Sequence, residues 1–220
     1  MSIEVYWISG SAPAWRVLLM LEIKGLEYKS HVLQTSKKEQ KQAWFLGLNP
    51  RGQIPLVKDN GIVVSESLAI MHYLERKYPD RPLFGNDSAD TARVEQTVHE
   101  ILSYVDKPIA DIVQPIFRNK IEKNRTSLNK AAAATHKELA FIENKLLQQA
   151  WLTGPELSVA DIVLIPTMQR LLRAISKEPQ LTSELGLASL DASYPALNSW
   201  NNRVEALPAF HATFPPHWRD

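Results

Sequence analysis

The chain has 220 residues, of which 45% are hydrophobic and 22% charged, and its formal net charge at pH 7 is +1. These values are typical of one large or two small soluble globular domains, and so balanced a charge does not suggest a bulk polyanion such as nucleic acid as a partner. The absence of cysteine excludes disulfides, thiolate metal sites and a cysteine nucleophile, so any thiol chemistry needs a thiol that a ligand brings.

The N-terminal sequence has neither a basic start nor a long apolar core, so we expect no secretory signal. No apolar run reaches the roughly 18 residues of a membrane span, and the cytoplasm is the expected compartment. Residues 3–8 are short, β-branched and aromatic, which predicts a buried strand. Residues 13–25 then predict a helix, with a proline near its start and a glycine just past its end. The junction carries Ser9 and Ser11, whose hydroxyls suit either a plain helix start or a site for an anion or a thiolate.

The rest of the first half predicts a small α/β layer domain. Residues 27–33 alternate like a second strand, and residues 37–52 indicate a short polar helix or loop that ends in turn signals. The stretch "IPLVKDNGIVV" at 54–64 has the pattern of a β-hairpin with an Asp-Asn-Gly turn. Residues 65–80 predict a helix that a proline stops. The predicted order is therefore β-α-β-α-β-β-α.

The second half predicts helices only. Four segments have helical spacing of apolar residues: 91–113, 127–149, 158–175 and 196–207. No strand pattern appears among them. We therefore expect an α/β domain over residues 1–81, a linker rich in proline, glycine and aspartate, and an all-helical domain over residues 90–220.

Two short stretches in the first half suggest ligand contacts. Ile54-Pro55 opens a strand; spacing alone favours a trans edge proline, whereas a cis bond would turn the Ile54 backbone outward, where it could pair with a peptide ligand. Glu66 and Ser67 lie at the start of a helix. They suit a plain capped helix, or a site in which free N–H groups bind a carboxylate and the glutamate holds an ammonium.

Four motifs follow one another along the chain. They are a serine five residues before the arginine of "WRV" at 15–17, "NPRGQIP" at 49–55, "ESLAI" at 66–70, and the capping pair Ser158 and Asp161 followed by an apolar helix. This series resembles the cytosolic glutathione transferases over almost the whole chain, in particular a serine-type, bacterial zeta/theta/phi-like class. The resemblance implies a thioredoxin-like, glutathione-binding domain over 1–81 and an all-helical, electrophile-binding domain over 90–220. It also implies a homodimer, with glutathione as cosubstrate and no metal.

The resemblance assigns six residues to glutathione binding: Lys41, Gln53, Ile54, Pro55, Glu66 and Ser67. In the family, the residue before a cis-proline pairs its backbone with the cysteinyl unit. The acidic residue and the serine of the helix start hold the γ-glutamyl end. Some classes place a basic residue near position 41 for the glycine carboxylate, and the position of Gln53 often lines the same site.

Three side chains compete for activation of the thiol. A thiol with a pKa of about 8.5 is mostly protonated at neutral pH, and a hydroxyl that donates a hydrogen bond favours the thiolate. Ser11 lies five residues before Arg16, the spacing of the catalytic serine in the serine-type classes. Ser9 is close by, and Tyr6 resembles the tyrosine-type classes after a one-residue gap. We favour Ser11, which would act as a donor and not as a nucleophile.

The resemblance also suggests substrates. We expect conjugation of glutathione to electrophilic, mostly apolar small molecules, with Tyr104, Ile112 and Phe117 as candidate pocket residues. One alternative is zeta-like maleylacetoacetate-type cis-trans isomerisation, because Arg173 has the spacing of a zeta-class arginine that binds the substrate carboxylate. Against it, Ser11 is followed by alanine and proline where the zeta signature has serine and cysteine. A second alternative is a glutathione-transferase-like binding module without turnover.

Overall fold

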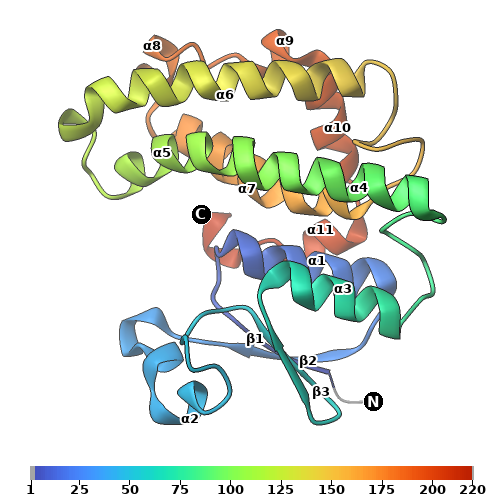
Figure 1. The fold of residues 1–220 in the computed structure, drawn as a ribbon. Helices are drawn as coiled ribbons and strands as arrows, with labels where there is room; N and C mark the ends of the chain where they lie inside the picture. Colours follow the sequence, from blue (N-terminus) through green and yellow to red (C-terminus); the bar gives the residue numbers. More distant parts are fainter. Residues whose placement is uncertain (1–2, 220) are drawn as a thin grey trace. The chain divides into compact units, whose positions relative to one another are not determined.

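The computed structural model describes residues 3–219 (Figure 1). They group into two compact units. Unit 1 contains the chain up to Pro82 together with the segment from Leu207 onward, and unit 2 contains Leu83–Ala206. The C-terminal segment, which the sequence places in the helical half, thus groups with the α/β unit.

Unit 1 is built on a four-stranded mixed sheet with the order β2-β1-β3-β4. Its strands are β1 (Ile3–Trp7), β2 (Tyr28–Val32), β3 (Leu56–Asp59) and β4 (Ile62–Ser65). β1 pairs parallel with β2 and antiparallel with β3, and β3 pairs antiparallel with β4. A β-α-β unit followed by a β-hairpin is the arrangement of a thioredoxin-like fold, and it confirms the predicted order of elements.

Helices cover both faces of this sheet. α1 (Ala12–Lys24) and α3 (Ser67–Lys77) lie side by side on one face, above the strands in Figure 1. On the other face Tyr6 and Leu56 pack against Phe45 of α2 (Ala43–Leu46). The short helical turns η1 (Thr35–Lys37) and η2 (Glu39–Lys41) precede α2.

An ion pair ties the end of α1 to α3. The Lys24 side chain is fully buried; its Nζ lies 2.9 Å from Glu75 Oε2 and donates to the carbonyls of Asp80 and Arg81 at 3.0 Å. A buried ammonium is tolerated only when such acceptors surround it. Because this contact lies at the C-terminal ends of the two helices, their N-terminal ends face the opposite end of the sheet.

Two short elements complete unit 1. They are α11 (Pro208–Thr213) and the turn η5 (Pro216–Trp218). α11 packs against α1. The C-terminal segment therefore lies against α1, the helix that follows β1.

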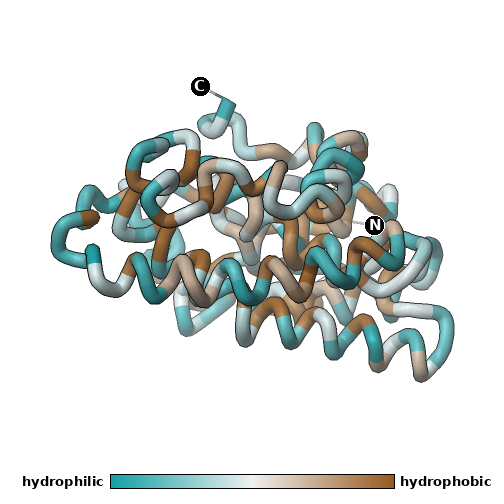
Figure 2. Tube along the Cα trace, turned by 90° about the horizontal axis from the view of Figure 1, so that it is seen from above, coloured by the Kyte–Doolittle hydropathy of each residue, from teal (hydrophilic) through white to brown (hydrophobic). Residues whose placement is uncertain are grey.

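The described residues of unit 2 form helices and no sheet. In chain order they are α4 (Ser88–Glu100), the π-helical turn η3 (Ile101–Val105), α5 (Asp106–Phe117), η4 (Glu122–Asn124), α6 (Arg125–Leu146), α7 (Val159–Lys177), α8 (Pro179–Glu184), α9 (Leu190–Ser193) and α10 (Pro195–Glu205). Hydrophilic and hydrophobic stretches alternate along the long helices in Figure 2, the pattern of amphipathic helices. Among residues 3–219 no helix is long and apolar enough to span a bilayer.

The predicted helix over 91–113 contains a π-helical turn, which the sequence did not indicate. The turn directly precedes α5, and Pro108 lies in the first turn of that helix. Proline has no N–H and its ring excludes the carbonyl one turn back, so a widened turn before it is a local accommodation. The capping box that starts α7 is present as predicted, with Asp161 accepting from the Ser158 N–H at 2.9 Å.

Candidate functional site

The strand register brings three chain segments to one end of the sheet. Tyr6 lies opposite Leu56, and Leu56 lies opposite Ser65. The turn after β1, the residues before β3 and the residues after β4 therefore all leave the sheet at the same end. These are the segments with Ser9 and Ser11, with Ile54 and Pro55, and with Glu66 and Ser67. The N-termini of α1 and α3 lie at this end too, and their aligned peptide dipoles favour a negative charge there.

Ser11 is the N-cap of α1 and still has a proton to donate. Its Oγ accepts from the Ala14 N–H at 3.4 Å, and its backbone N–H closes the preceding turn on the Ile8 carbonyl at 3.2 Å. A hydroxyl has one donor and two acceptor positions. No acceptor for the hydroxyl proton of Ser11 exists among the described residues. The capping role and a donor role are therefore compatible.

The two rival side chains are engaged elsewhere. Ser9 Oγ lies 3.0 Å from Nδ1 of His217, so the C-terminal tail binds this hydroxyl. The Tyr6 hydroxyl donates to Glu4 at 3.2 Å, and its ring stacks on His31 with centroids 4.4 Å apart. Burial and the neighbouring Glu4 carboxylate raise the pKa of Tyr6. Glu4 precedes Tyr6 on β1, so the phenol points back along the strand, away from the Ser9–Ser11 turn.

The Ile54-Pro55 bond is cis. The trans bond favoured by spacing alone is wrong, and the cis bond implied by the resemblance is present. Within residues 3–219 the backbone of Ile54 makes no hydrogen bond, whereas the carbonyl of the preceding Gln53 accepts from Asn49 Nδ2 at 2.9 Å. An unpaired N–H and C=O at the start of an extended segment can pair with a peptide in the manner of an added strand.

Glu66 has an unusual backbone conformation at the start of α3. Its φ is +70°, a region that non-glycine residues populate rarely and that clusters at ligand sites. Its side chain is exposed and does not cap the helix. The first helical N–H groups, beginning with Ser67, have no acceptor among the described residues. An open helix start beside a free carboxylate suits a zwitterion, whose carboxylate and ammonium would bind these two groups.

Lys41 and Gln53 both lie near the loop between α2 and β3, which contains Arg51 and Gly52. Lys41 Nζ donates to the Arg51 carbonyl at 3.0 Å and lies over Gly52. A Cβ at Gly52 would be 2.9 Å from Lys41 Nζ and 2.6 Å from the Gln40 carbonyl, so only glycine fits there. Gln53 is exposed. The ammonium of Lys41 is thus held at the loop that leads into Ile54.

Arg173 belongs to unit 2. Its guanidinium lies over the Phe117 ring with Cζ 4.6 Å from the centroid, and Lys177 Nζ lies 5.3 Å from the same centroid. Both cations are within cation–π distance of the same ring. Of the other candidate pocket residues, Ile112 is fully buried in the helical core, whereas Tyr104 is 59% exposed.

Sequence reasoning missed His217 as a neighbour of the site. The tail "FPPHWRD" stands out by its aromatic and proline content, but nothing in the sequence indicates what it contacts. Its partner Ser9 lies 208 positions earlier in the chain.

The fold and the site together define a class: a thioredoxin-like unit with a cis-proline and an open helix start, followed by an all-helical unit. Comparison with known proteins leads to the same class. Residues 10–77 match the glutathione S-transferase N-terminal domain, and residues 105–208 match the glutathione S-transferase C-terminal domain.

Similar proteins span the chain from end to end. Glutathione S-transferase A of Pleuronectes platessa is 30% identical over 218 residues, which is 96% of this chain and 91% of that protein. Glutathione S-transferase 1 of Dianthus caryophyllus is 31% identical over 204 residues, covering 90% of this chain and 85% of that protein. The crystal structure of a glutathione S-transferase from the Antarctic clam Laternula elliptica has a TM-score of 0.86 at 35% identity, covering 100% of this chain and 95% of that one. The chain belongs to the glutathione S-transferase family.

Proposed function

We propose that this protein transfers glutathione to electrophilic, mostly apolar small molecules, and that Ser11 activates the thiol. One observation carries the proposal. Of the three candidate hydroxyls, only Ser11 has no side-chain partner among the described residues, and it lies at the same end of the sheet as the unpaired Ile54 backbone and the open start of α3.

The three segments suit the three parts of glutathione. The γ-glutamyl end would bind with its carboxylate at the open N–H groups of α3, beginning with Ser67, and with its ammonium at Glu66. The Ile54 backbone would pair with the cysteinyl unit, with Pro55 fixing the direction of the chain. Gln53 lies on the loop before Ile54, and the Lys41 ammonium is held at that loop by the Arg51 carbonyl, where it suits the glycine carboxylate.

Binding in this direction places the sulfur at the β1–α1 turn. There the Ser11 hydroxyl would donate to the thiolate, and the N-terminus of α1 would add its positive partial charge. Each unit by which the thiol pKa falls corresponds to about 1.4 kcal/mol in favour of the thiolate. The thiolate then attacks the electrophile, and the proton leaves to solvent or to the leaving group.

Substitutions of Ser11 test this role. Ser11→Ala removes the donor and should lower kcat/KM for a generic aromatic electrophile by about a hundred-fold, the loss typical of one donor to a developing or stabilised anion. It also removes the N-cap acceptor, which costs about 1 kcal/mol of stability. Ser11→Asp keeps an N-cap acceptor, so it should be as stable as the wild type. Its carboxylate repels the thiolate, so its kcat/KM should be at least as low as that of Ser11→Ala.

Ser11→Thr and Tyr6→Phe are the matched controls. Threonine keeps the hydroxyl and should keep most of the activity, and Tyr6→Phe removes no donor to the sulfur. Full activity of Ser11→Ala would contradict the proposal, and a large loss in Tyr6→Phe would transfer the role to the phenol. Retention on immobilised glutathione without turnover on a panel of electrophiles would favour a binding module.

The isomerase alternative needs Arg173 to hold a substrate carboxylate. Its guanidinium lies over the Phe117 ring, and Ala12 and Pro13 stand where the zeta signature has serine and cysteine. We therefore retain conjugation as the proposal.

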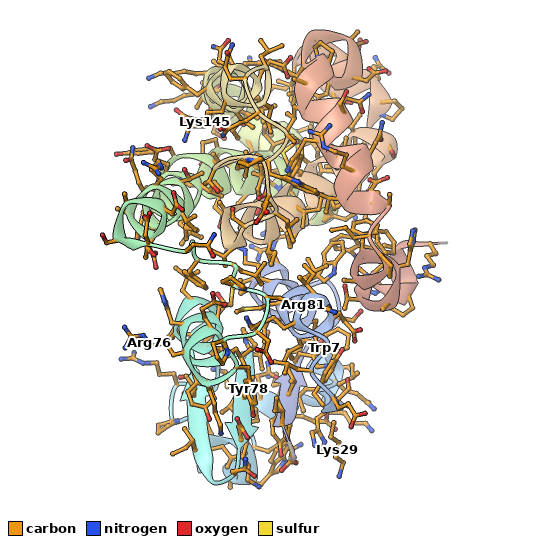
Figure 3. All side chains as sticks on the ribbon, turned by 90° about the vertical axis from the view of Figure 1, so that its right-hand side faces the viewer. Trp7, Lys29, Arg76, Tyr78, Arg81 and Lys145 are labelled. Atoms are coloured by element: carbon orange, nitrogen blue, oxygen red, sulfur yellow. The ribbon has the colours of Figure 1, made fainter. Side chains whose placement is uncertain are left out.

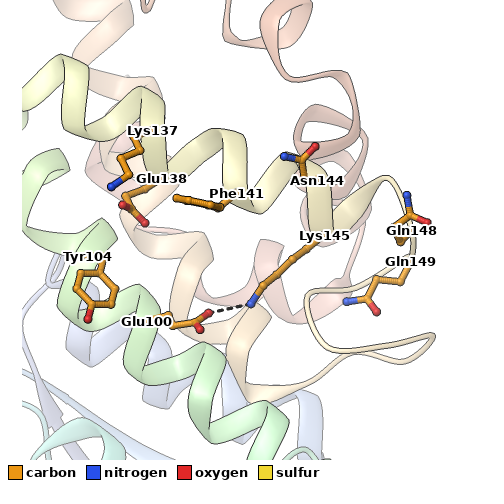
Figure 4. Close-up of a pocket in the computed structure, with 9 residues that line it drawn as sticks. All are labelled: Glu100, Tyr104, Lys137, Glu138, Phe141, Asn144, Lys145, Gln148 and Gln149. Atoms are coloured by element: carbon orange, nitrogen blue, oxygen red, sulfur yellow. Dashed lines mark hydrogen bonds and ion pairs between the residues drawn. The ribbon is translucent and has the colours of Figure 1, made fainter.

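We also propose that two copies of the chain form a two-fold homodimer, as the family resemblance implies. A groove on unit 2 supports this (Figure 4). It has a volume of about 750 Å³ and lies between the Glu100–Tyr104 stretch and α6. Tyr104 and Phe141 line it and are 59% and 57% exposed, so both rings are available for an apolar contact with a second copy of the chain.

A further inference from the structure

The C-terminal segment is anchored on the start of α1. The Trp15 indole N–H donates to Thr213 Oγ1 at 2.8 Å, and this pair is buried. The Trp15 ring packs against Phe210, Phe214 and Trp218 with centroids 5.5–5.6 Å apart. Aromatic pairs at such distances add stability beyond their buried area. The tail is therefore fixed before its last residues reach the β1–α1 turn.

The end of the tail sits directly on that turn. His217 Nδ1 lies 3.0 Å from Ser9 Oγ. A Cβ added to Gly10 would lie 3.2 Å from His217 Nε2 and 3.3 Å from Trp218 Nε1, and Gly10 has a φ of +82°. The two rings thus rest on a residue that has no side chain, in a conformation that glycine adopts at no cost.

Restraint of this turn reaches Ser11. The turn is closed by the hydrogen bond from the Ser11 N–H to the Ile8 carbonyl, so a contact that fixes Ser9 and Gly10 also fixes the backbone of Ser11. Donation to a thiolate weakens steeply with distance and angle, and a functional group must be held to within about 0.5 Å by its supporting contacts.

We propose that His217 is a positioning residue for glutathione transfer. It binds the hydroxyl of Ser9 and, with Trp218 on Gly10, holds the turn in the conformation from which the Ser11 hydroxyl reaches the sulfur. The same contact keeps the Ser9 hydroxyl from competing for the thiolate. The inference rests on the proposed role of Ser11.

The test compares His217→Ala, His217→Asn and His211→Ala at saturating electrophile. His211 is an exposed histidine on α11 and serves as the matched control. We expect His217→Ala to lower kcat by about ten- to a hundred-fold, the upper value being the loss that a misplacement of about 1 Å can cause, with KM for glutathione within about two-fold of the wild type. The ultraviolet absorbance of bound glutathione thiolate should fall in parallel. Asparagine places an amide where Nδ1 lies and should restore most of kcat, and His211→Ala should behave as the wild type.

Three results would overturn the proposal. They are an unchanged kcat in His217→Ala, a rise in KM as large as the fall in kcat, and an asparagine variant as impaired as the alanine variant. The last result would assign the effect to packing of the ring and not to the hydrogen bond.

A double-mutant cycle separates this inference from the proposed function. Ser9→Ala, His217→Ala and the double variant are compared by thermal unfolding without glutathione. Non-additive effects support the Ser9–His217 contact even if the protein fails to bind glutathione, which would sink the proposed function alone. Additive effects would overturn the positioning role whatever the activity.

Discussion

One hydroxyl at the start of α1 is compatible with two roles. Ser11 accepts from the helix with a lone pair, and its own proton has no acceptor among the described residues. An N-cap serine is a common feature that by itself indicates only a helix start. It becomes a candidate catalytic group because Ser9 and Tyr6 are bound by His217 and Glu4, and because the register brings Ile54 and Glu66 to the same end of the sheet.

Glu66 provides a residue-scale prediction on binding. Glu66→Gln removes the charge that would hold the ammonium of glutathione while keeping the size of the side chain. A charge-assisted hydrogen bond contributes about 1.5–3 kcal/mol, so KM for glutathione should rise roughly ten-fold or more, with a smaller change in kcat. Steady-state kinetics with varied glutathione measure both.

Glu27→Gln is the control for this change. Glu27 is exposed and directly precedes β2 at the opposite end of the sheet. Glu27→Gln should leave KM for glutathione unchanged. An unaltered KM in Glu66→Gln would show that the carboxylate does not contact glutathione.

Asp59 provides a prediction on pH. It is fully buried and accepts from Lys77, Tyr73 and Tyr78 at 2.8–2.9 Å; Figure 3 shows Tyr78 between α3 and the sheet. Burial opposes its ionisation, but the hydrogen bonds from Lys77, Tyr78 and Tyr73 prevail and lower the pKa of Asp59 below its ordinary value. The folded pKa lies below the unfolded one, so this stabilisation is present above the unfolded pKa of about 3.9 and is lost as pH falls through the folded value.

Acid unfolding of Asp59→Asn tests this. The variant should lose about 2–3 kcal/mol at neutral pH, because charged hydrogen bonds disappear, and its stability should vary less below about pH 4 than that of the wild type. Urea unfolding at a series of pH values measures both effects. Asp111→Asn, which removes an exposed pair with Lys107, should change stability by no more than about 0.5 kcal/mol.

At the scale of elements, the start of α7 depends on a single carboxylate. Asp161 accepts from the N–H groups of Leu152 and Ser158, from the Ser158 hydroxyl and from the Trp200 indole, at 2.8–3.0 Å. All of these donors are buried with it. The sequence predicts only the capping pair, whereas the structure adds the loop before α7 and the tryptophan of α10.

Two substitutions distinguish the cap from the network. Ser158→Ala should cost about 1 kcal/mol, the usual loss of an N-cap. Asp161→Ala leaves several buried donors without a partner and should cost at least about 3 kcal/mol. Chemical denaturation of both variants measures the difference. Equal losses would mean that the aspartate acts only through the cap.

The order of elements is predictable because each of them has a local signal. Residues 54–64 show the hairpin as two apolar runs around Asp-Asn-Gly, and Ser158 with Asp161 shows the start of α7. The isomer of Ile54-Pro55 is not predictable from spacing; only the family resemblance indicates it. Neither the spacing of residues nor the family resemblance predicts the contact of His217 with Ser9, because the two side chains are 208 positions apart and no local pattern links them.

At the scale of the whole molecule, the proposed homodimer predicts a dependence on Phe141. Phe141→Glu replaces an exposed aromatic ring of the groove beside Tyr104 with a charged side chain and should shift the protein toward the monomer, because the apolar contact of that ring with the partner is lost. Sedimentation velocity over a range of concentrations measures the assembly. Leu147→Glu is the control: Leu147 is 60% exposed at the end of α6 but does not line the groove. A monomeric wild type at all concentrations would refute the homodimer.

The contact of the C-terminal tail with the β1–α1 turn affects how the protein should be prepared for kinetic measurements. An affinity tag fused directly after residue 220 would begin within a few residues of His217, whose ring binds the Ser9 hydroxyl. A tag at the N-terminus would begin near Ile3, at the far end of β1. Preparations that differ only in the end that carries the tag should therefore differ in specific activity, and the N-terminal fusion is the one suited to kinetic work.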